Sequence, residues 1–379
     1  MLLCHEDLVP PEDLRPEDDK PLVPWRTEYD VTSTLRAMGH QVEVVGVHSD
    51  LGVLRRAMED LRPHIAFNLI EEFHGEAVYD QHVVSYLELM RMPYTGCSPR
   101  GLLLAHDKGL CRKILAYHRV PGPRFALFAM NRKVRRPARL PFPLFVKSQV
   151  EDASLGIAQA SVVHDDEKLI ERVRFIHEHV GTDAIAEEYV DGRELYVGVL
   201  GNQRLQTFPI WEMVFEKLPE GTHRIATAKA KWDASYQEKM GIGLRRAEAL
   251  PEGAAERIHA LARRVYRILG LSGYARLDLR LDQEGRIHLI EVNPNPDLAY
   301  DDLYAEAALR SASSAASSSP AAGCPARGAS SRSRRRARAR SPSHRAYSAE
   351  RRKGTQRAMD SPRARHRLSA RLRWRRPSR

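Results

Sequence analysis

The segment Tyr274-Ala-Arg-Leu-Asp-Leu-Arg-Leu281, followed at a short distance by Ile287-His-Leu-Ile-Glu-Val-Asn293, decides the fold of this chain. Polar and apolar side chains alternate strictly along the first stretch, which is the pattern of a β-strand with two different faces. Residues 283–286 (Gln-Glu-Gly-Arg) indicate a turn that returns the chain into the second stretch. We therefore predict an antiparallel ribbon of two strands.

A four-residue turn in this ribbon sets Asp278 opposite Glu291 and Arg276 opposite Asn293. Like charges that lie directly opposite each other destabilise a sheet unless a cation lies between them. Two carboxylates and an Asn carbonyl are hard oxygen ligands, which magnesium accepts when it also holds phosphate oxygens. We interpret the ribbon as a platform for metal and phosphate. The alternative is an exposed hairpin whose acids contact only water.

The length of 379 residues allows two or three domains with a proper core. The absence of an apolar stretch of about 18 residues argues against a membrane-spanning helix. The first residues also lack the pattern of a secretory signal. The four cysteines show no metal-binding or redox spacing: Cys4, Cys97, Cys111 and Cys324. These features favour a reducing, cytoplasmic location and no membrane partner.

The net charge of +11 conceals two different parts of the chain. Residues 309–379 hold 21 Lys and Arg residues and 2 acids, whereas the first 308 residues hold 39 basic and 47 acidic groups. The high isoelectric point therefore belongs to the C-terminal tail. The part of the chain that is expected to fold is mildly acidic.

The tail consists almost wholly of Ser, Ala, Arg and Pro, with hardly any aliphatic side chains for a core. We predict that residues 309–379 are disordered. We favour an out-of-frame continuation of a GC-rich coding sequence, because the switch is abrupt and falls where the fold still needs a closing helix. The alternative is an arginine-rich arm that binds nucleic acid through its phosphates.

Residues 1–97 have the pattern of a small α/β domain. Short apolar stretches at 41–47 and 64–70 are candidate strands. Stretches with helical character alternate with them: 27–38, 51–61 and 77–91. This alternation predicts parallel strands that are joined by helical crossovers.

Two further parts follow, at 98–183 and 184–308. The first contains a strand, a polar loop and a charged helix: 141–147, 148–156 and 165–180. The second contains two strands and an amphipathic helix before the ribbon: 184–190, 195–200 and 253–269. The predicted fold class is therefore α/β, in three parts, with the tail at 309–379.

Two lysines are candidate phosphate ligands. Lys147 ends an apolar strand and precedes the small-residue loop 148–156, whose backbone amides supply further donors. Lys108 lies in the sequence Ala105-His-Asp-Lys108-Gly. The alternative for Lys147 is a side chain that packs its stem on apolar surface and extends its charge into water.

Three further charged residues are candidates for nucleotide contacts. Glu187 lies at the end of a strand, and Glu194 comes just after Asp191-Gly192. A glutamate there can accept hydrogen bonds from ribose hydroxyls. Lys231 lies in Ala228-Lys-Ala-Lys231-Trp. A solvated charge is the alternative for all three.

The succession of these residues resembles the ATP-grasp superfamily, and most closely the D-alanine–D-alanine ligases within it. The resemblance covers about residues 25–308. It rests on these motifs: Met92-Pro-Tyr-Thr-Gly96, Asp107-Lys108, Phe145-Val-Lys147, Glu187 with Gly192-Arg-Glu194, Arg276-Leu-Asp278 and Glu291-Val-Asn293. It implies an ATP-grasp fold, α+β in the ATP-binding part, behind an N-terminal pre-ATP-grasp domain, with ATP clamped between two sheets.

The resemblance implies a role for each nucleotide-binding residue. Lys108 and Lys147 would hold phosphates of ATP, and Lys231 would approach the γ-phosphate and take part in catalysis. Glu187 would lie at the edge of the adenine, and Glu194 would take the ribose hydroxyls.

The metal site and the remaining catalytic residues follow from the same resemblance. Asp278, Glu291 and Asn293 would hold two magnesium ions, with manganese as a substitute, that bridge the phosphates. Arg276 would stabilise the developing oxyanion. The loop around Ser154 would close over the phosphates and exclude water.

The implied reaction joins a carboxylate to an amine. The γ-phosphoryl group first moves onto the carboxylate to make an acyl phosphate, and cations neutralise the charge on the transferring group. An amine then attacks and phosphate leaves. The implied partners are small carboxylate and amine substrates, amino acids or short peptides, with the D-alanine dipeptide as one candidate. Glu28 and Glu76 are candidate contacts for a substrate amine.

Four positions depart from the family pattern. Trp232 follows Lys231 where the family has a Tyr, and Asp302 stands where the family has a serine that receives a substrate carboxylate. Asp152 replaces a usual glycine of the phosphate loop, and Asn293-Pro-Asn-Pro296 is closer to other ATP-grasp ligases. Because an aspartate repels a carboxylate, these departures concern the substrates rather than ATP.

Two functions of other classes stay open. The chain could be a degenerate module that holds a nucleotide without turnover, although the intact Lys147, Asp278, Glu291 and Asn293 argue against this. Alternatively, it could bind nucleic acid, but only if the tail is genuine. A homodimer and a monomer are both compatible with the sequence.

Overall fold

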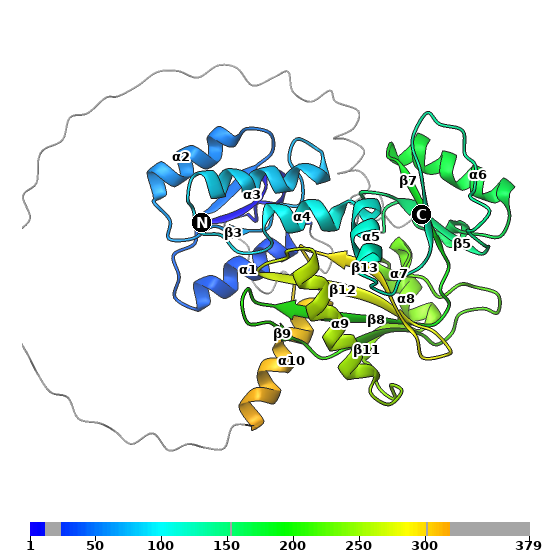
Figure 1. Ribbon diagram of the computed structural model, residues 1–379. Coiled ribbons are helices and arrows are strands. Elements are labelled where there is room, and N and C mark those ends of the chain that lie inside the picture. The colour runs from blue at the N-terminus through cyan, green and yellow to red at the C-terminus, as the bar shows by residue number, and fades with distance from the viewer. Residues whose placement is uncertain (12–23, 152–153, 301, 319–379) are drawn as a thin grey trace, which may run out of the picture. The chain divides into compact units, whose positions relative to one another are not determined.

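This computed structural model describes residues 1–11, 24–151, 154–300 and 302–318, and Figure 1 shows their helices and strands. Three sequence-based predictions lie outside what it describes: those on Asp152, on the side chain of Trp232 and on residues 319–379. Residues Met1–Ala312 form one compact unit. None of the helices in the described residues combines the length and the apolar character that crossing a bilayer requires.

The N-terminal part contains a parallel sheet of three strands in the order β2-β1-β3. Its elements are β1 (Leu2–His5), η1 (Glu6–Leu8), α1 (Arg26–Ala37), β2 (Val44–Val47), α2 (Leu51–Leu61), β3 (Phe67–Asn68), η2 (Ala77–Tyr79) and α3 (Asp80–Leu89). The predicted parallel strands with helical crossovers are confirmed. The central strand β1 was not predicted; all four of its residues are buried, so its sequence lacks an alternating pattern.

Helix α2 illustrates how local sequence sets the ends of these elements. Asp50 Oδ1 accepts a hydrogen bond from the Gly52 amide at 2.7 Å, which satisfies one free donor of the first turn. Leu54 and Met58, one turn apart, are buried in the core beside the sheet. The helix ends at Arg62, whose left-handed φ of 47° turns the chain away.

The central part contains an antiparallel sheet of four strands in the order β4-β7-β5-β6. Its elements are α4 (Pro99–His106), α5 (Lys108–Tyr117), β4 (Phe125–Phe128), β5 (Leu144–Ser148), η3 (Gln159–Ser161), β6 (Val162–Val163), α6 (Asp166–Phe175), the π-helical turn η4 (Ile176–Val180) and β7 (Ala184–Glu188). Strand β7 lies between β4 and β5. This sheet therefore extends to Glu188, past the boundary at residue 183 that the sequence suggested.

The third part contains a larger antiparallel sheet in the order β11-β10-β8-β12-β13, with β9 paired to β8. Its elements are β8 (Arg193–Leu200), β9 (Gln206–Thr207), β10 (Trp211–Phe215), α7 (Ala228–Trp232), α8 (Ala234–Met240), β11 (Ile242–Arg246), α9 (Ala254–Ile268), β12 (Tyr274–Leu281), β13 (Ile287–Asn293) and α10 (Leu303–Ser318). The predicted two-stranded ribbon is thus one end of this sheet, because β12 also pairs with β8. Asp278 is only 6% exposed, which excludes the exposed hairpin.

The pairing of β12 with β13 confirms the predicted register at the polar end of the ribbon. Asp278 lies opposite Glu291, and Arg276 lies opposite Asn293. Opposite side chains of an antiparallel pair start about 5 Å apart on the same face of the sheet. The two carboxylates are therefore neighbours.

The turn of the ribbon is longer than predicted. Leu281 pairs with Ile287, so the turn spans 282–286 and has five residues instead of four. A β-bulge then restores the register, because the ladder on β13 steps from Leu289 to Glu291 and leaves Ile290 without an opposite residue. The longer turn and the bulge compensate for each other.

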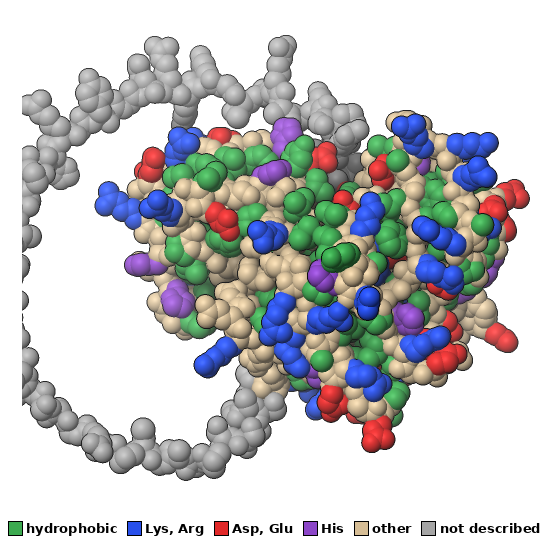
Figure 2. Space-filling model, viewed as in Figure 1, with side chains coloured by type: hydrophobic (Ala, Val, Ile, Leu, Met, Phe, Trp, Pro, Cys, Tyr) green, Lys and Arg blue, Asp and Glu red, His purple; other side chains and the backbone are tan. Residues whose placement is uncertain are grey.

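Helix α9 packs on the large sheet as the predicted amphipathic helix. Its buried positions recur every three or four residues: Ala254, Ile258, Ala262, Val265 and Tyr266. Arg257, Arg264 and Arg267 are exposed on the same helix, and Figure 2 shows basic side chains gathered over it. These arginines form the solvated face of the helix.

Helix α10 extends to Ser318, past residue 308, where the sequence analysis placed the start of disorder. That prediction was wrong for residues 309–318. The first turns are anchored because Leu303, Tyr304 and Ala307 are buried in a core cluster that includes Trp211. The sequence that follows contains no Gly or Pro up to Ser318, so nothing in it breaks the helix that continues from this anchor.

Truncation of the buried face of α9 should destabilise the protein. Ile258 is fully buried between α9 and the large sheet, so Ile258→Ala removes apolar contacts and leaves a cavity. We expect a loss of about 2–5 kcal/mol in the free energy of unfolding, measured by urea denaturation. The exposed neighbour Arg257→Ala should change it by no more than about 0.5 kcal/mol. Equal effects of the two variants would contradict this packing.

Candidate functional site

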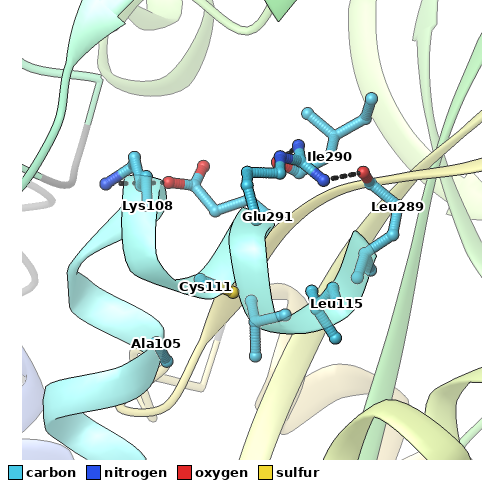
Figure 3. Close-up of a pocket in the computed structure, with 9 residues that line it drawn as sticks. Ala105, Lys108, Cys111, Leu115, Leu289, Ile290 and Glu291 are labelled. Carbon is cyan, nitrogen blue, oxygen red and sulfur yellow. Dashed lines mark hydrogen bonds and ion pairs between the residues drawn. The ribbon is translucent and has the colours of Figure 1, made fainter. Parts of the chain in front are cut away.

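The first turn of α5 brings Lys108 to the acidic end of β13. Asp107 caps this helix, since its Oδ1 accepts a hydrogen bond from the Leu110 amide at 2.8 Å. Lys108 Nζ lies 3.1 Å from Glu291 Oε1 and donates to the Glu151 carbonyl at 2.9 Å. Figure 3 shows Lys108 and Glu291 pointing toward each other from the helix and the strand.

The charges of three predicted lysines act on Glu291, and Lys108 contacts it directly. Burial raises its pKa, but the charges of Lys147, Lys108 and Lys231 outweigh burial and hold the pKa well below its ordinary value. These lysines come from β5, α5 and α7. The carboxylate is therefore ionised at neutral pH, and three separate segments direct positive charge at it.

Glu187 on β7 forms a second buried ionic centre. It is 2% exposed, and its Oε1 accepts a hydrogen bond from Arg112 Nε at 2.5 Å. Its Oε2 lies 3.3 Å from Lys147 Nζ. Burial raises the pKa of Glu187, but Arg112 and Lys147 outweigh it, so the pKa is lowered. Lys147 is 4% exposed, which excludes the alternative of a charge that extends into water.

Arg276 and Asp278 form a bidentate pair on β12. Arg276 donates to the two oxygens of Asp278, from Nε at 2.8 Å and from Nη2 at 3.0 Å. Burial raises the pKa of Asp278, and Arg276 opposes this only in part. The guanidinium of Arg276 also lies over the ring of Tyr196, 5.5 Å from its centroid. Its position is therefore fixed by β12 and by the neighbouring strand β8.

Glu194 on β8 is held through both of its oxygens. Tyr196 donates to Oε1 at 2.7 Å, and Arg280 Nη2 donates to Oε2 at 2.5 Å. Arg280 also donates to the carbonyl of Arg224 at 2.5 Å. These contacts fix the direction of the carboxylate, which can accept further hydrogen bonds from hydroxyl groups.

The loop after β5 is joined to the segment that carries Lys231. Ser154 Oγ donates to the Ala226 carbonyl at 2.8 Å. Gln159 exchanges two hydrogen bonds with the backbone of His223, each at 3.0 Å. The residues predicted to close over the phosphates therefore contact the approach to α7.

The remaining predicted residues lie near the same end of the large sheet. Lys231 on α7 is half-buried, and its charge lowers the pKa of both Glu291 and Asp278. Asn293 ends β13, and its Oδ1 accepts a hydrogen bond from the Asn295 amide at 2.8 Å. The carbonyl oxygen of Asn293 is thus oriented by the loop that follows the strand.

Glu28 and Glu76 lie near segments that contact the loop after β13. Thr27, next to Glu28 on α1, donates to Asp297 Oδ1 at 2.7 Å. Asn295 of the same loop donates from its side-chain amide to the carbonyl of Ile70 at 3.1 Å. Ile70 comes shortly before Glu76 in the sequence. Glu28 is buried and Glu76 is half-buried. Their contact with a substrate amine stays a prediction.

The predicted metal ligands suit magnesium. In the described part of the chain, no three His, Cys, Asp or Glu side chains come together as a metal site. The predicted set instead consists of two carboxylates, Asp278 and Glu291, and the amide oxygen of Asn293. Magnesium is commonly bound by one or two carboxylates together with water and substrate phosphates. Because the two acids face each other and Glu291 is ionised, these residues fit the ion.

Arg112 is a residue of this region that sequence reasoning missed. It is 7% exposed and contacts Glu187 directly. The available signal was its spacing, because residues four apart on a helix lie on the same face and Arg112 follows Lys108 by four. The charge patterns at strand ends, which identified the other residues, do not reveal a cation in the middle of a helix.

Comparisons with known proteins agree with this geometry. The family model described as D-ala D-ala ligase C-terminus matches residues 117–315. A D-alanine–D-alanine ligase of Bordetella avium is 31% identical over 240 residues, which cover 62% of this chain and 70% of that protein. The chain belongs to the D-alanine–D-alanine ligase family. An uncharacterised protein, y4sG of Sinorhizobium fredii, is 32% identical over 304 residues, or 76% of this chain and 85% of that protein.

Solved structures of this family have the same fold. The D-alanine–D-alanine ligase of Bacillus anthracis complexed with ATP gives a TM-score of 0.62 at 18% identity, over 82% of this chain and 91% of that one. The VanG D-Ala:D-Ser ligase of Enterococcus faecalis gives a TM-score of 0.57 at 18% identity, over 81% and 93%. The predicted ATP-grasp fold is confirmed. The protein is an ATP-grasp ligase, of the class that forms carbon–nitrogen bonds.

Asp302, which the sequence analysis expected to depart from the family pattern, lies just before α10. Its Oδ1 accepts a hydrogen bond from the Tyr304 amide at 3.2 Å. Burial raises its pKa to about 6; Arg276 opposes the rise and Asp297 adds to it. Asp302 thus brings a second carboxylate close to Arg276, in addition to Asp278.

The half-buried carboxylate of Asp302 should give the protein a pH-dependent stability. Because the pKa of Asp302 is raised above its ordinary value of 3.8 to about 6, the folded state binds the proton more tightly than the unfolded chain. The stabilisation is complete below the ordinary value and is lost as the pH rises through about 6. The free energy of unfolding of Asp302→Asn, relative to that of wild type, should therefore increase as the pH rises from 4 to 7. The measurement is urea denaturation at a series of pH values.

Asp50 offers a matched control, because it also caps a helix but is exposed. Its hydrogen bonds from the Gly52 amide and from Arg56 lower its pKa, so its stabilisation is lost as the pH falls. Asp50→Asn should show the opposite trend, with a loss relative to wild type toward neutral pH. A flat difference between Asp302→Asn and wild type across this range would contradict the raised pKa of Asp302.

Proposed function

We propose that this ligase joins a carboxylate to an amine, with ATP as the phosphoryl donor and an acyl phosphate as the intermediate. The observation that supports the proposal best is the contact of Lys108 with Glu291 at 3.1 Å, next to the pair of Lys147 with Glu187, with the charges of Lys147 and Lys231 also acting on Glu291. Cations and carboxylates in one buried place suit a site that receives metal ions together with phosphates. Relatives with the name D-alanine–D-alanine ligase support the same class of reaction.

In this proposal, each nucleotide contact has a residue with fitting chemistry. Lys108 and Lys147 bind phosphate oxygens and exchange part of their present carboxylate contacts for them. Lys231, half-buried on α7, neutralises the γ-phosphoryl group. Glu187 accepts a hydrogen bond at the adenine edge, and Glu194 accepts from the ribose hydroxyls. The ATP complex of the Bacillus anthracis ligase supports the use of this nucleotide.

Asp278, Glu291 and Asn293 would hold the divalent metal, which we propose to be two magnesium ions, replaceable by manganese. When bound, the metal neutralises phosphate charge and orients the phosphate oxygens. The protein's own part is to keep the two carboxylates side by side and to keep Glu291 ionised. The strand register and the three lysines support that part.

The proposed reaction has two steps. The γ-phosphoryl group passes to an oxygen of the substrate carboxylate and its bond to ADP breaks, while Lys231 and Arg276 neutralise the negative charge that develops. The loop around Ser154 keeps water away from the acyl phosphate. The amine nitrogen then attacks the carbonyl carbon, the carbon–nitrogen bond forms, the carbon–oxygen bond to phosphate breaks, and inorganic phosphate leaves.

The substrates are proposed only as a class, an acid and an amine that are amino acids or short peptides. The D-alanine dipeptide is one candidate product. Another pair of amino acids or peptides fits at least as well as two D-alanines. The reason is that the carboxylate of Asp302 beside Arg276 weakens the attraction for a substrate carboxylate. We also propose a cytoplasmic location. The described cysteines, Cys4, Cys97 and Cys111, are buried and free, as a reducing compartment allows.

The metal ligands provide the direct test of this function. ADP and phosphate should be released only when a suitable acid and a suitable amine are both present, which a panel of amino acids and short peptides can establish. Asp278→Asn and Glu291→Gln should then lower turnover by about 100-fold or more, because each removes charge that steadies the transferring phosphoryl group. The measurement is coupled detection of ADP.

Glu284→Gln is the matched control, since Glu284 lies in the exposed turn of the same strand pair and contacts only Arg286 among the described residues. It should retain the turnover of wild type. Undiminished turnover in Glu291→Gln would contradict the proposed metal site. ATP binding without turnover across the whole panel would contradict ligation itself.

A further inference from the structure

Arg112 joins three segments of the chain through one buried side chain. It lies one turn after Lys108 on α5 and is 7% exposed. Its Nε donates to Glu187 Oε1, its Nη1 to the Leu289 carbonyl and its Nη2 to the Ile290 carbonyl, each at 2.5 Å. The guanidinium thus connects α5 with β7 and with the bulge of β13.

The two carbonyls belong to the part of β13 where the strand ladder is interrupted. Ile290 has no opposite residue on β12 because the register shifts there. A buried backbone carbonyl that leaves a ladder needs another donor. Arg112 supplies donors to this carbonyl and to the preceding one. The next residue is Glu291, so the direction of its side chain depends on how the bulge is held.

Gly122 is a second observation on the same contact. A Cβ atom at this position would lie 2.9 Å from Arg112 Nη1 and 3.2 Å from the Leu289 carbonyl oxygen. The neighbouring Pro121 carbonyl accepts a hydrogen bond from the Leu289 amide at 3.0 Å. The segment before β4 therefore packs directly on the bulge, and only glycine leaves room for the guanidinium there.

The same side chains line a small pocket between α5 and β13. Its lining includes Lys108, Arg112, Leu289, Ile290 and Glu291. Figure 3 shows Lys108 and Glu291 on one side of this pocket and Leu289 on the other. The ion pair of Lys108 with Glu291 and the bulge held by Arg112 are thus parts of one arrangement.

We propose that Arg112 is a positioning residue for the ligase reaction. Its guanidinium holds both the bulge before Glu291 and the carboxylate of Glu187. The proposed metal ligand Glu291 and the proposed adenine contact Glu187 are thereby positioned to bind the same nucleotide. This inference rests on the proposed function. It adds that a change at Arg112, which touches neither metal nor substrate, alters the requirement for magnesium.

Arg112→Lys separates the geometry of Arg112 from its charge. A lysine keeps a positive charge beside Glu187, but its single ammonium cannot reach this carboxylate and both carbonyls at once. We expect a soluble protein whose half-saturating Mg²⁺ concentration for turnover rises roughly tenfold to a hundredfold. Turnover at saturating Mg²⁺ should recover toward that of wild type, whereas a purely structural defect would persist there.

Gly122→Ala tests the same contact without a change at Arg112. The added methyl group should push the guanidinium away from the Leu289 carbonyl, and we expect a rise in the Mg²⁺ requirement in the same direction. Two controls match these variants. Arg124→Met removes the exposed partner of Glu188, next to Glu187 on β7, and Gly243→Ala adds a methyl group with no atom closer than 3.9 Å.

The measurements are Mg²⁺ titrations of ADP release by the full chain, isothermal titration with a non-hydrolysable ATP analogue, and the thermal midpoint. The proposal holds if Arg112→Lys and Gly122→Ala raise the Mg²⁺ requirement and both controls do not. It is overturned if these variants, folded by their thermal midpoints, titrate like the controls. If Gly122→Ala fails to fold, the Mg²⁺ titration of Arg112→Lys alone decides whether the proposal holds. Absence of nucleotide binding and of turnover in wild type would instead refute the proposed function.

Discussion

The repulsion between Asp278 and Glu291, held opposite each other on adjacent strands, is the constraint on which the rest of the site depends. Two unit charges about 5 Å apart repel by roughly 3 kcal/mol at an effective dielectric constant near 20. Two kinds of contact offset this repulsion. Arg276 pairs with Asp278 from the same strand, and Lys108 contacts Glu291 from α5 while the charges of Lys147 and Lys231 act on it. The site is therefore assembled only when all these segments have folded together.

Buried ion pairs of this kind contribute more to geometry than to stability. The cost of removing charges from water offsets most of their attraction, and the loss of one partner leaves an uncompensated buried charge. Glu187 illustrates this, because Arg112 and Lys147 occupy its two oxygens inside the protein. These contacts hold the side chains of Arg112 and Lys147 in defined positions. In the proposed function, phosphates would exchange with the carboxylates that face the lysines.

The sequence predicted which acids face each other better than it predicted the contacts around them. Alternation in β12 and the turn that follows identified the facing acids, although the assumed turn was one residue short and only the bulge at Ile290 made the register correct. The buried strand β1 lacked alternation. Sequence reasoning did not identify Arg112, because its partners are backbone carbonyls and a glutamate distant in sequence. Periodicity reports faces of elements, whereas such contacts depend on how the elements meet.

The unpaired residue at Ile290 bears on how this family can vary in length. A change of one residue in a strand flips every following side chain to the other face. The bulge lies between the turn at 282–286 and Glu291, so its gain or loss can absorb a one-residue insertion or deletion in the turn. A one-residue change in the length of the turn is thus compatible with the register from Glu291 to Asn293. A chain with a turn one residue shorter would keep this register without the bulge, and Arg112 would then have only Glu187, and not the bulge, to hold.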